Sequence, residues 1–325
     1  MKGIELSSLY YATYGKNMIR EKFPDYEKRI AVGLVGQGSE CFMYDDILST
    51  DHDFGPGFCM WLTDEDYAAI GEELSDMYDT LPKEFLGFKR METKRAGARV
   101  GVFRIGDFYE NFIGSPDVPT TNTQWLRIPE RLLATATNGK VFRDDLGEFS
   151  RIRNALLKFY PEDVRIKKIA ARAAIMAQSG QYNYSRCMKR EDDVAASLAL
   201  SEFVSSTMSM IYLLNKRYAP YYKWLHRGLS ELPKLSEAGG MLKELVDMPS
   251  QSANWKNLDE ITFLYGVNFK DSKVEMIEKI CSMVLKELVN QGLANDGDAF
   301  LELHVDEIIE KISDMKLRIM HVMDA

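Results

Sequence analysis

The most constraining feature of the sequence is an apolar run that leads directly into a glycine-rich turn. Residues 30–35 read Ile-Ala-Val-Gly-Leu-Val and are followed by Gly36-Gln37-Gly38-Ser39. Such a short apolar run bounded by glycines is typical of a buried strand. Asp51 and Asp53 come next, before a second apolar run near residues 57–62. The pattern predicts a strand, a Gly-Ser turn, a short helix and then a strand that opens with two carboxylates.

The two aspartates are suited to holding a divalent cation. On a strand, residues at i and i+2 point to the same face of the sheet, so Asp51 and Asp53 would repel each other without a cation between them. His52 would point the other way, which favours a supporting role over that of a base. Oxygen ligands without a thiol favour Mg²⁺ or Mn²⁺. The alternative without a metal is that Asp51 and Asp53 are simply solvated residues at the beginning of a strand.

The Gly38-Ser39 turn is suited to an anion. Its backbone N–H groups and the Ser39 hydroxyl would lie at the start of a helix, where a phosphate is stabilised. A phosphate cradle beside a metal pair indicates phosphoryl or nucleotidyl transfer. Glu40, Asp45 and Asp46 are expected to form a solvated acidic helix start, with extra metal ligands as the alternative.

Composition limits the classes of protein to which the chain can belong. A chain of 325 residues, 46% hydrophobic and 28% charged, predicts about two globular domains. The net charge of -8 argues against strong DNA binding. Neither a membrane span nor a signal peptide is expected, so we expect no membrane partner and a cytoplasmic location. The four cysteines contain no C-x-x-C pair, and only four histidines occur, which argues against structural zinc.

Local patterns predict two different halves. The first half alternates strands and helices, with a third strand at 98–105, an aromatic helix after it and a single helix at 125–137. The second half reads as helices at 151–159, 164–178, 193–217 and 221–232, divided at Pro161, Gly180, Pro220 and Pro233. Two further helices are expected around 274–288 and 305–319.

These patterns give a fold class and a domain division. We expect an α/β (α+β) catalytic domain with a small mixed sheet over residues 1–147. A substrate-binding, all-α helical bundle would follow over 148–245, and a C-terminal helical extension over 246–325. The amphipathic helices of this extension are candidates for a homodimer surface.

The motif resembles that of nucleotidyltransferases of the DNA polymerase beta superfamily. In that superfamily a Gly-Ser at the start of a helix precedes Asp-x-Asp on the next strand, and Gly38, Ser39, Asp51 and Asp53 match those positions. The string GQGSE…DDILSTDHDFGPGF is more similar still to a group of bacterial proteins catalogued as a domain of unknown function. Their Arg-Tyr-x-Pro-x-x-Lys-Trp-Leu segment matches residues 217–225. The resemblance covers about residues 30–233.

The resemblance implies a donor nucleotide and assigns roles to residues. It implies a Mg²⁺-bound NTP, with ATP as the first expectation, in which Asp51 and Asp53 hold the metal and Gly38 and Ser39 contact phosphate. The superfamily has a third carboxylate on a later strand. Residues 100–105 contain no acid, so Asp107 is the candidate and Glu92 and Glu130 are its rivals.

The second half offers one further phosphate ligand, Lys223. Its neighbour Trp224 is expected in the core, with base stacking as the alternative. The sequence therefore predicts transfer of a nucleoside monophosphate to a hydroxyl of a small, antibiotic-like acceptor. Two alternatives stay open, a catalytically inactive nucleotide-binding regulator and an enzyme that modifies tRNA or protein in a toxin or stress system.

Overall fold

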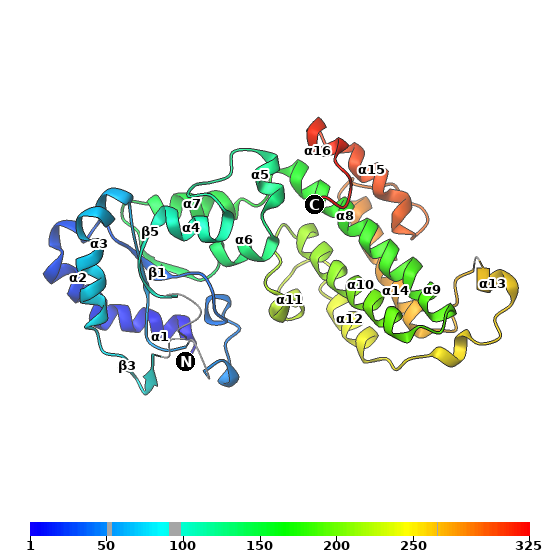
Figure 1. The fold of residues 1–325 in the computed structure, drawn as a ribbon, viewed down its shortest axis with the longest axis horizontal. Coiled ribbons are helices and arrows are strands. Elements are labelled where there is room, and N and C mark those ends of the chain that lie inside the picture. Colours follow the sequence, from blue (N-terminus) through cyan, green and yellow to red (C-terminus); the bar gives the residue numbers. More distant parts are fainter. Residues whose placement is uncertain (51–53, 91–98, 265) are drawn as a thin grey trace. The chain divides into compact units, whose positions relative to one another are not determined.

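The chain folds into two compact units in a computed structural model that describes residues 1–50, 54–90, 99–264 and 266–325. The first unit contains residues 1–120 and 128–159, and the second contains residues 121–127 and 160–325. Figure 1 shows that the first unit contains a sheet with helices and that the second unit is an assembly of helices. Each unit is described below by itself.

The first unit contains helices on both sides of a small sheet. Its strands are β1 (Ala31–Leu34), β2 (Cys59–Leu62), β3 (Glu84–Phe85), β4 (Phe88–Lys89), β5 (Gly101–Arg104) and β6 (Lys140–Arg143). Its α-helices are α1 (Gly3–Tyr10), α2 (Lys16–Lys22), α3 (Asp64–Asp79), α4 (Ile105–Ile113), α6 (Glu130–Thr137) and α7 (Glu148–Leu157). A π-helical turn η1 (Tyr11–Gly15) joins α1 to α2, and 3₁₀ turns occur at η2 (Pro24–Tyr26), η3 (Glu40–Phe42) and η4 (Ile47–Thr50).

The described part of the second unit is helical. Its α-helices are α5 (Asn122–Arg127), α8 (Glu162–Met176), α9 (Ser185–Lys189), α10 (Asp193–Leu214), α11 (Tyr222–Leu229), α12 (Ala238–Asp247), α13 (Glu260–Leu264), α14 (Ser272–Asn290), α15 (Val305–Glu310) and α16 (Met315–Ile319). Between them lie a π-helical segment η5 (Ala177–Tyr184) and 3₁₀ turns η6 (Ser252–Trp255) and η7 (Leu301–His304).

The main sheet is mixed, as expected, with strand order β5-β2-β1-β6. β1 is antiparallel to both of its neighbours, whereas β2 and β5 are parallel. Sequence patterns predict β1, β2 and β5 within a few residues but miss β6 and the short strands β3 and β4. The β6 residues Lys140–Arg143 carry two basic side chains and are only partly buried, so they lack an apolar run. The β3–β4 hairpin forms a separate two-stranded sheet.

Both faces of the central strands are covered. All four residues of β1 and of β2 are buried. On one face Met60 and Leu62 pack with apolar residues of α1, α2 and α3. On the other face the Trp61 ring stacks on Phe149 of α7, with centroids 3.8 Å apart, and meets Phe108 of α4 edge-on. The first unit is therefore a three-layer α/β/α arrangement (Figure 1).

Local capping signals fix several helix ends. Thr63 accepts a hydrogen bond from the backbone N–H of Asp66, so α3 begins where its cap predicts. The single helix predicted over 125–137 is wrong, because it is two helices, α5 and α6, separated at Ile128-Pro129. Proline lacks an N–H and disfavours helical geometry in the residue before it, which explains the break. The predicted helix over 305–319 is likewise divided into α15 and α16, with Asp314 capping the latter.

The second unit is built around α8, η5 and α10. The predicted break at Gly180 is wrong, because the chain continues from α8 through η5 into α9 without leaving helical geometry. A Cβ at Gly180 would lie 2.3 Å from the Phe203 ring, so the absence of a side chain lets η5 pack on α10. Here glycine serves close helix packing and not helix termination.

Helix α10 is the one helix in the described ranges with the length and hydropathy of a membrane span, with a mean hydropathy of 1.4. It packs against α8 and η5, and its buried residues include Phe203, Ile211 and Leu213. A buried core helix of a bundle accounts for the same hydropathy.

The compact units differ from the sequence-based division at three places. Helix α7 belongs to the first unit, which ends at Phe159 and not at residue 147. Helix α5 belongs to the second unit, although it precedes α6 and β6 in the chain. Residues 246–325 form part of the second unit, where α14 contacts α10, α12 and η5, and α15 contacts α8.

Candidate functional site

The glycine-rich turn forms where β1 ends. Gly36 and Gly38 both have φ of +121°, a conformation that side chains rarely adopt. Ser39 then takes right-handed helical geometry and precedes η3, which is followed by Met43 in the left-handed region. The predicted order of strand, Gly-Ser turn and short helix is confirmed for the described residues, with a single 3₁₀ turn as the helix.

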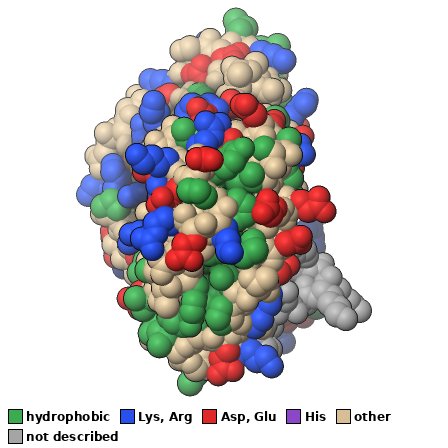
Figure 2. All heavy atoms as spheres, turned by 90° about the vertical axis from the view of Figure 1, so that its left-hand side faces the viewer, with side chains coloured by type: hydrophobic (Ala, Val, Ile, Leu, Met, Phe, Trp, Pro, Cys, Tyr) green, Lys and Arg blue, Asp and Glu red, His purple; other side chains and the backbone are tan. Residues whose placement is uncertain are grey.

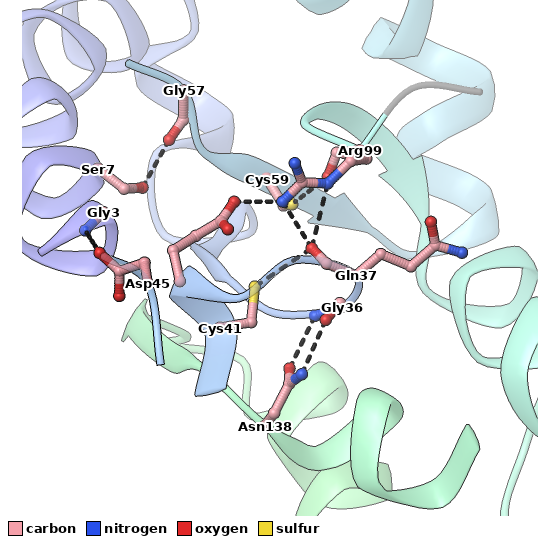
Figure 3. A network of polar contacts seen from close by, with 11 residues as sticks. Gly3, Ser7, Gly36, Gln37, Cys41, Asp45, Gly57, Cys59, Arg99 and Asn138 are labelled. Atoms are coloured by element: carbon pink, nitrogen blue, oxygen red, sulfur yellow. Dashed lines mark hydrogen bonds and ion pairs between the residues drawn. The ribbon is translucent and has the colours of Figure 1, made fainter. Parts of the chain in front are cut away.

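One side of this turn is held by an ion pair. Arg99, which lies just before β5, donates to the backbone carbonyl of Gln37 from Nε (3.1 Å) and from Nη2 (2.7 Å). The same guanidinium pairs with the carboxylate of Glu40. A Cβ at Gly38 would lie 2.0 Å from Arg99 Nη2, so a side chain at position 38 would displace this guanidinium. Figure 3 shows Arg99 lying against the turn.

The opposite side of the turn is held by Asn138. Its Oδ1 accepts from the backbone N–H of Gly36 (2.9 Å) and its Nδ2 donates to the carbonyl of the same residue (2.7 Å). The neighbouring Gly139 N–H donates to the Cys41 carbonyl at 2.7 Å. Figure 3 shows Asn138 and Arg99 approaching the turn from different sides. The backbone of the turn is therefore fixed before any ligand arrives.

The turn also has backbone N–H groups that are available to bind a ligand. Within the described ranges, the backbone N–H groups of Gln37, Gly38 and Ser39 and the Ser39 hydroxyl donate to no acceptor. Gln37 is exposed and the next two residues are half-buried. Successive N–H groups in such a turn form a concave site that binds anions.

Glu40 and Asp45 are not the solvated acids that we expected. Both are buried, and Asp45 Oδ2 accepts from the backbone N–H of Gly3 at 2.9 Å. Lys2 lies 3.7 Å from the other Asp45 oxygen. Asp45 therefore stabilises the start of α1, where the helix dipole favours a negative charge. Burial raises the pKa of the Glu40 carboxyl, an effect that the Arg99 charge opposes.

The two cysteines near the turn are not nucleophiles. Burial raises the pKa of Cys59 to about 12, and burial also holds the pKa of Cys41 well above its usual value. Their thiols donate to the backbone carbonyls of Arg99 and Gln37. Both cysteines therefore act as small buried side chains.

The predicted metal ligands, Asp51 and Asp53, lie outside the described residues, as do His52 and Glu92. Strand β2 begins only at Cys59. Among the described residues no group of three or more His, Cys, Asp or Glu side chains is arranged to hold a metal ion. The Asp51–Asp53 metal site stays a prediction.

The structure does not bring Asp107 to the turn. Asp107 lies in the first turn of α4 with its carboxylate exposed, 4.0 Å from Arg104 Nε. It follows the end of β5, whereas the start of β5 lies beside the start of β2, at Gly101 opposite Cys59. The α4 residues near Gly36 are Phe108 and Phe112. Among the described residues Asp107 pairs with Arg104, and its rival Glu130 lies in the first turn of α6.

Lys223 belongs to the second unit. It is exposed on α11, and its Nζ lies 5.0 Å from the centre of the Trp224 ring. Arg227 lies over the same ring at 5.9 Å. Trp224 is half-buried. This arrangement agrees with a stacking surface as well as with a core anchor, and the phosphate role of Lys223 stays a prediction.

Sequence patterns missed Arg99 and Asn138. Asn138-Gly139 carries a recognisable turn signal, but that signal indicates only the end of a helix. Arg99 ends a basic segment that precedes β5, and no local pattern links it to a turn 62 residues away.

Surface charge agrees with the composition. The face of the first unit that carries α2 and α3 shows Lys and Arg side chains mixed with Asp and Glu (Figure 2). A nucleic-acid surface would require clustered basic side chains. This face therefore gives no support to a DNA-binding role.

Comparison with known proteins finds one family model that matches part of the chain. Residues 125–225 match a domain of unknown function (DUF4037). The matched region runs from α5 to α11 and includes Asn138 and the Arg217–Leu225 segment, but it does not include the Gly36–Asp53 stretch. No curated protein and no solved structure matches the chain.

Proposed function

We propose that the chain is a nucleotidyltransferase that moves a nucleoside monophosphate from an NTP to a hydroxyl of a small-molecule acceptor. The observation that carries the proposal is the rigid turn at Gly36–Ser39. Arg99 binds the Gln37 carbonyl and Asn138 binds the Gly36 carbonyl, and the N–H groups of Gln37, Gly38 and Ser39 have no acceptor among the described residues. Phosphate oxygens are the acceptors that such a turn suits best.

The surrounding fold supports the same proposal. The turn follows a fully buried strand, and the next strand of the chain, β2, lies antiparallel beside it. The connection between them contains Asp51 and Asp53. These carboxylates would hold Mg²⁺, which supplies charge neutralisation to the phosphates when bound. Ser39 would contact a phosphate through its hydroxyl, and ATP is the expected donor.

The main test uses the two aspartates. Asp51→Asn and Asp53→Asn should each lower Mg²⁺-dependent pyrophosphate release by at least about a hundredfold, because lost charge neutralisation costs several kcal/mol in the transition state. The assay would use ATP, Mg²⁺ and a panel of hydroxylated, cationic small molecules. Asp64→Asn, an exposed residue in the first turn of α3, is the matched control. Activity that survives both changes would overturn the metal assignment.

The same assay identifies the third carboxylate. Asp107→Asn and Glu92→Gln remove one charge each. If Asp107 is catalytic, its change abolishes pyrophosphate release while the melting temperature stays constant. If release continues at the wild-type rate, Asp107 has no catalytic role and Glu92 becomes the next candidate.

A nucleotide-binding regulator is the second candidate. It is favoured by one observation: β5, the strand beside β2, contains no acid among Gly101–Arg104. Calorimetric titration with ATP and Mg²⁺, paired with the pyrophosphate assay, distinguishes the two functions. Nucleotide binding without any product would support the regulator.

A further inference from the structure

The Arg99–Glu40 ion pair is more deeply buried than a surface salt bridge. The two side chains are 15% and 10% exposed. Removing two charges from water is expensive, and the gain from pairing often fails to exceed that cost. Burial raises the pKa of Glu40 in spite of the neighbouring guanidinium, so the pair does not fully offset the cost of desolvating the carboxylate. Stability alone is therefore a poor explanation for this pair.

The position of the pair suggests what it does. Arg99 binds the Gln37 carbonyl with two donors, and Glu40 is the first residue of η3. The guanidinium and the carboxylate both occupy the space that a Cβ of Gly38 would need, at 2.0 Å and 2.5 Å. Arg99 thus holds the peptide unit between Gln37 and Gly38, whose N–H would meet a phosphate, and its partner Glu40 directly follows Ser39 in the chain.

We propose that Arg99 and Glu40 are positioning residues of the anion-binding turn, with Glu40 orienting Arg99 and Arg99 orienting the turn. This inference rests on the proposed function, because it takes the ligand of the turn to be the phosphate group of a nucleotide. The ordered turn then binds phosphate without a loss of backbone freedom at the moment of binding.

The direction in which Glu40→Gln changes the affinity for an anion distinguishes a positioning role from a simple effect of charge. If only the total charge near the turn matters, Glu40→Gln removes a negative charge and should strengthen binding of an anion. If Glu40 orients Arg99, the same change should weaken binding. Inorganic pyrophosphate without metal is the probe, and its dissociation constant is measured by titration calorimetry on the full chain.

We expect Glu40→Gln and Arg99→Gln each to raise the dissociation constant for pyrophosphate about tenfold, the effect of one lost hydrogen bond to a charged group. Arg99→Lys keeps the charge but not the two-donor contact and should not restore binding. The matched control is the Arg143–Glu27 pair, with a 3.0 Å contact and side chains 20% and 28% exposed. Glu27→Gln should leave the dissociation constant unchanged.

A double variant tests whether weaker binding comes from loss of the fold. Arg99→Gln combined with Glu40→Gln removes both charges and leaves neither one buried alone, so it should stay folded while binding weakly. Tighter binding by Glu40→Gln, or wild-type affinity in a folded double variant, would overturn the positioning roles and leave the proposed function standing. Absence of pyrophosphate binding by the wild type would overturn both. Binding that follows the expected pattern in a chain without transferase activity supports the positioning roles alone.

Discussion

Two buried aspartates in the described part of the chain, Asp66 and Asp271, are satisfied by different kinds of donor. Asp66 pairs with Arg29 at 2.8 Å and also accepts from the Thr63 hydroxyl. Asp271 accepts instead from Tyr184, Trp255 and the Lys273 backbone. A carboxylate surrounded by donors keeps its place in a core because each lone pair has a partner.

At Glu278 the cost of burial outweighs the hydrogen bond that the carboxylate accepts, which leads to a pH-dependent prediction. Burial raises its pKa above the ordinary 4.5, although the Gln181 amide donates to it at 2.7 Å. Ionisation therefore costs more in the folded state than in the unfolded state. This penalty is absent below the unfolded pKa, grows as the pH rises from there, and is complete above the folded pKa.

We expect Glu278→Gln to match the wild type in free energy of unfolding near pH 4 and to exceed it at pH 7, because glutamine carries no charge to desolvate and can still accept from Gln181. Urea unfolding at the two pH values measures the difference. Glu275→Gln, exposed on the same helix, is the control and should show no such pH dependence. A Glu278→Gln advantage that shrinks as the pH rises would contradict the predicted sign.

At the scale of elements, helix α14 begins with a buried cap that binds two other elements, in addition to its packing against α10, α12 and η5. Asp271 caps it through the Lys273 N–H and binds Tyr184 of η5 and Trp255 of η6. All three donors share one fully buried carboxylate. The cap therefore joins α14 to the preceding turn η6 and to η5, which lies much earlier in the chain.

Asp271→Asn should destabilise the protein by about 2 kcal/mol, because an amide NH₂ would replace one acceptor and face a buried N–H or O–H donor. The Trp255 N–H cannot reverse its role as a donor. Thermal and urea unfolding measure the loss.

Asp259→Asn is the control for this substitution. Asp259 accepts from the backbone and hydroxyl of Thr262 in α13, where the hydroxyl can rotate to accept from the new amide. We expect a change of at most about 0.5 kcal/mol. Equal losses in the two variants would mean that the shared carboxylate is not what holds α14.

At the scale of the whole molecule, the two units are interleaved along the chain. Helix α5 is part of the second unit, yet residues 128–159 return to the first. Its Trp125 is buried and meets the Tyr160 ring edge-on at 6.0 Å. In the first unit, Trp61 occupies the corresponding role as a buried anchor.

Trp125→Ala should reduce the stability of the second unit by about 3 to 5 kcal/mol, the usual cost of removing a buried tryptophan. Hydrogen exchange should show lost protection in α8 and retained protection in β1 and β2. Trp61→Ala should give the reverse pattern. If Trp125→Ala exposed β1 and β2 as strongly as α8, the assignment of α5 to the second unit would be wrong.

The sequence by itself determined the elements whose signals are local. The start of α3 follows from the Thr63 cap, and the first strand and turn follow from an apolar run that ends in glycines. The resemblance to a domain of unknown function rested on short motifs, and a match over residues 125–225 supports that part of it. Such signals act over a few residues, so they need no knowledge of the fold.

Only the tertiary structure decided which distant residues meet. Asn138 reaches Gly36 across 102 residues, and Arg99 reaches Gln37 across 62. β6 pairs with β1 although its residues contain no apolar run. Strand formation at this position depends on pairing with β1, which the residues of β6 alone do not indicate. Glu40 was expected to be solvated, but it is buried because Arg99, which precedes β5, and Gly3 of α1 lie against it. Local periodicity states which face of an element is apolar, but strand register and packing choose the partner of that face.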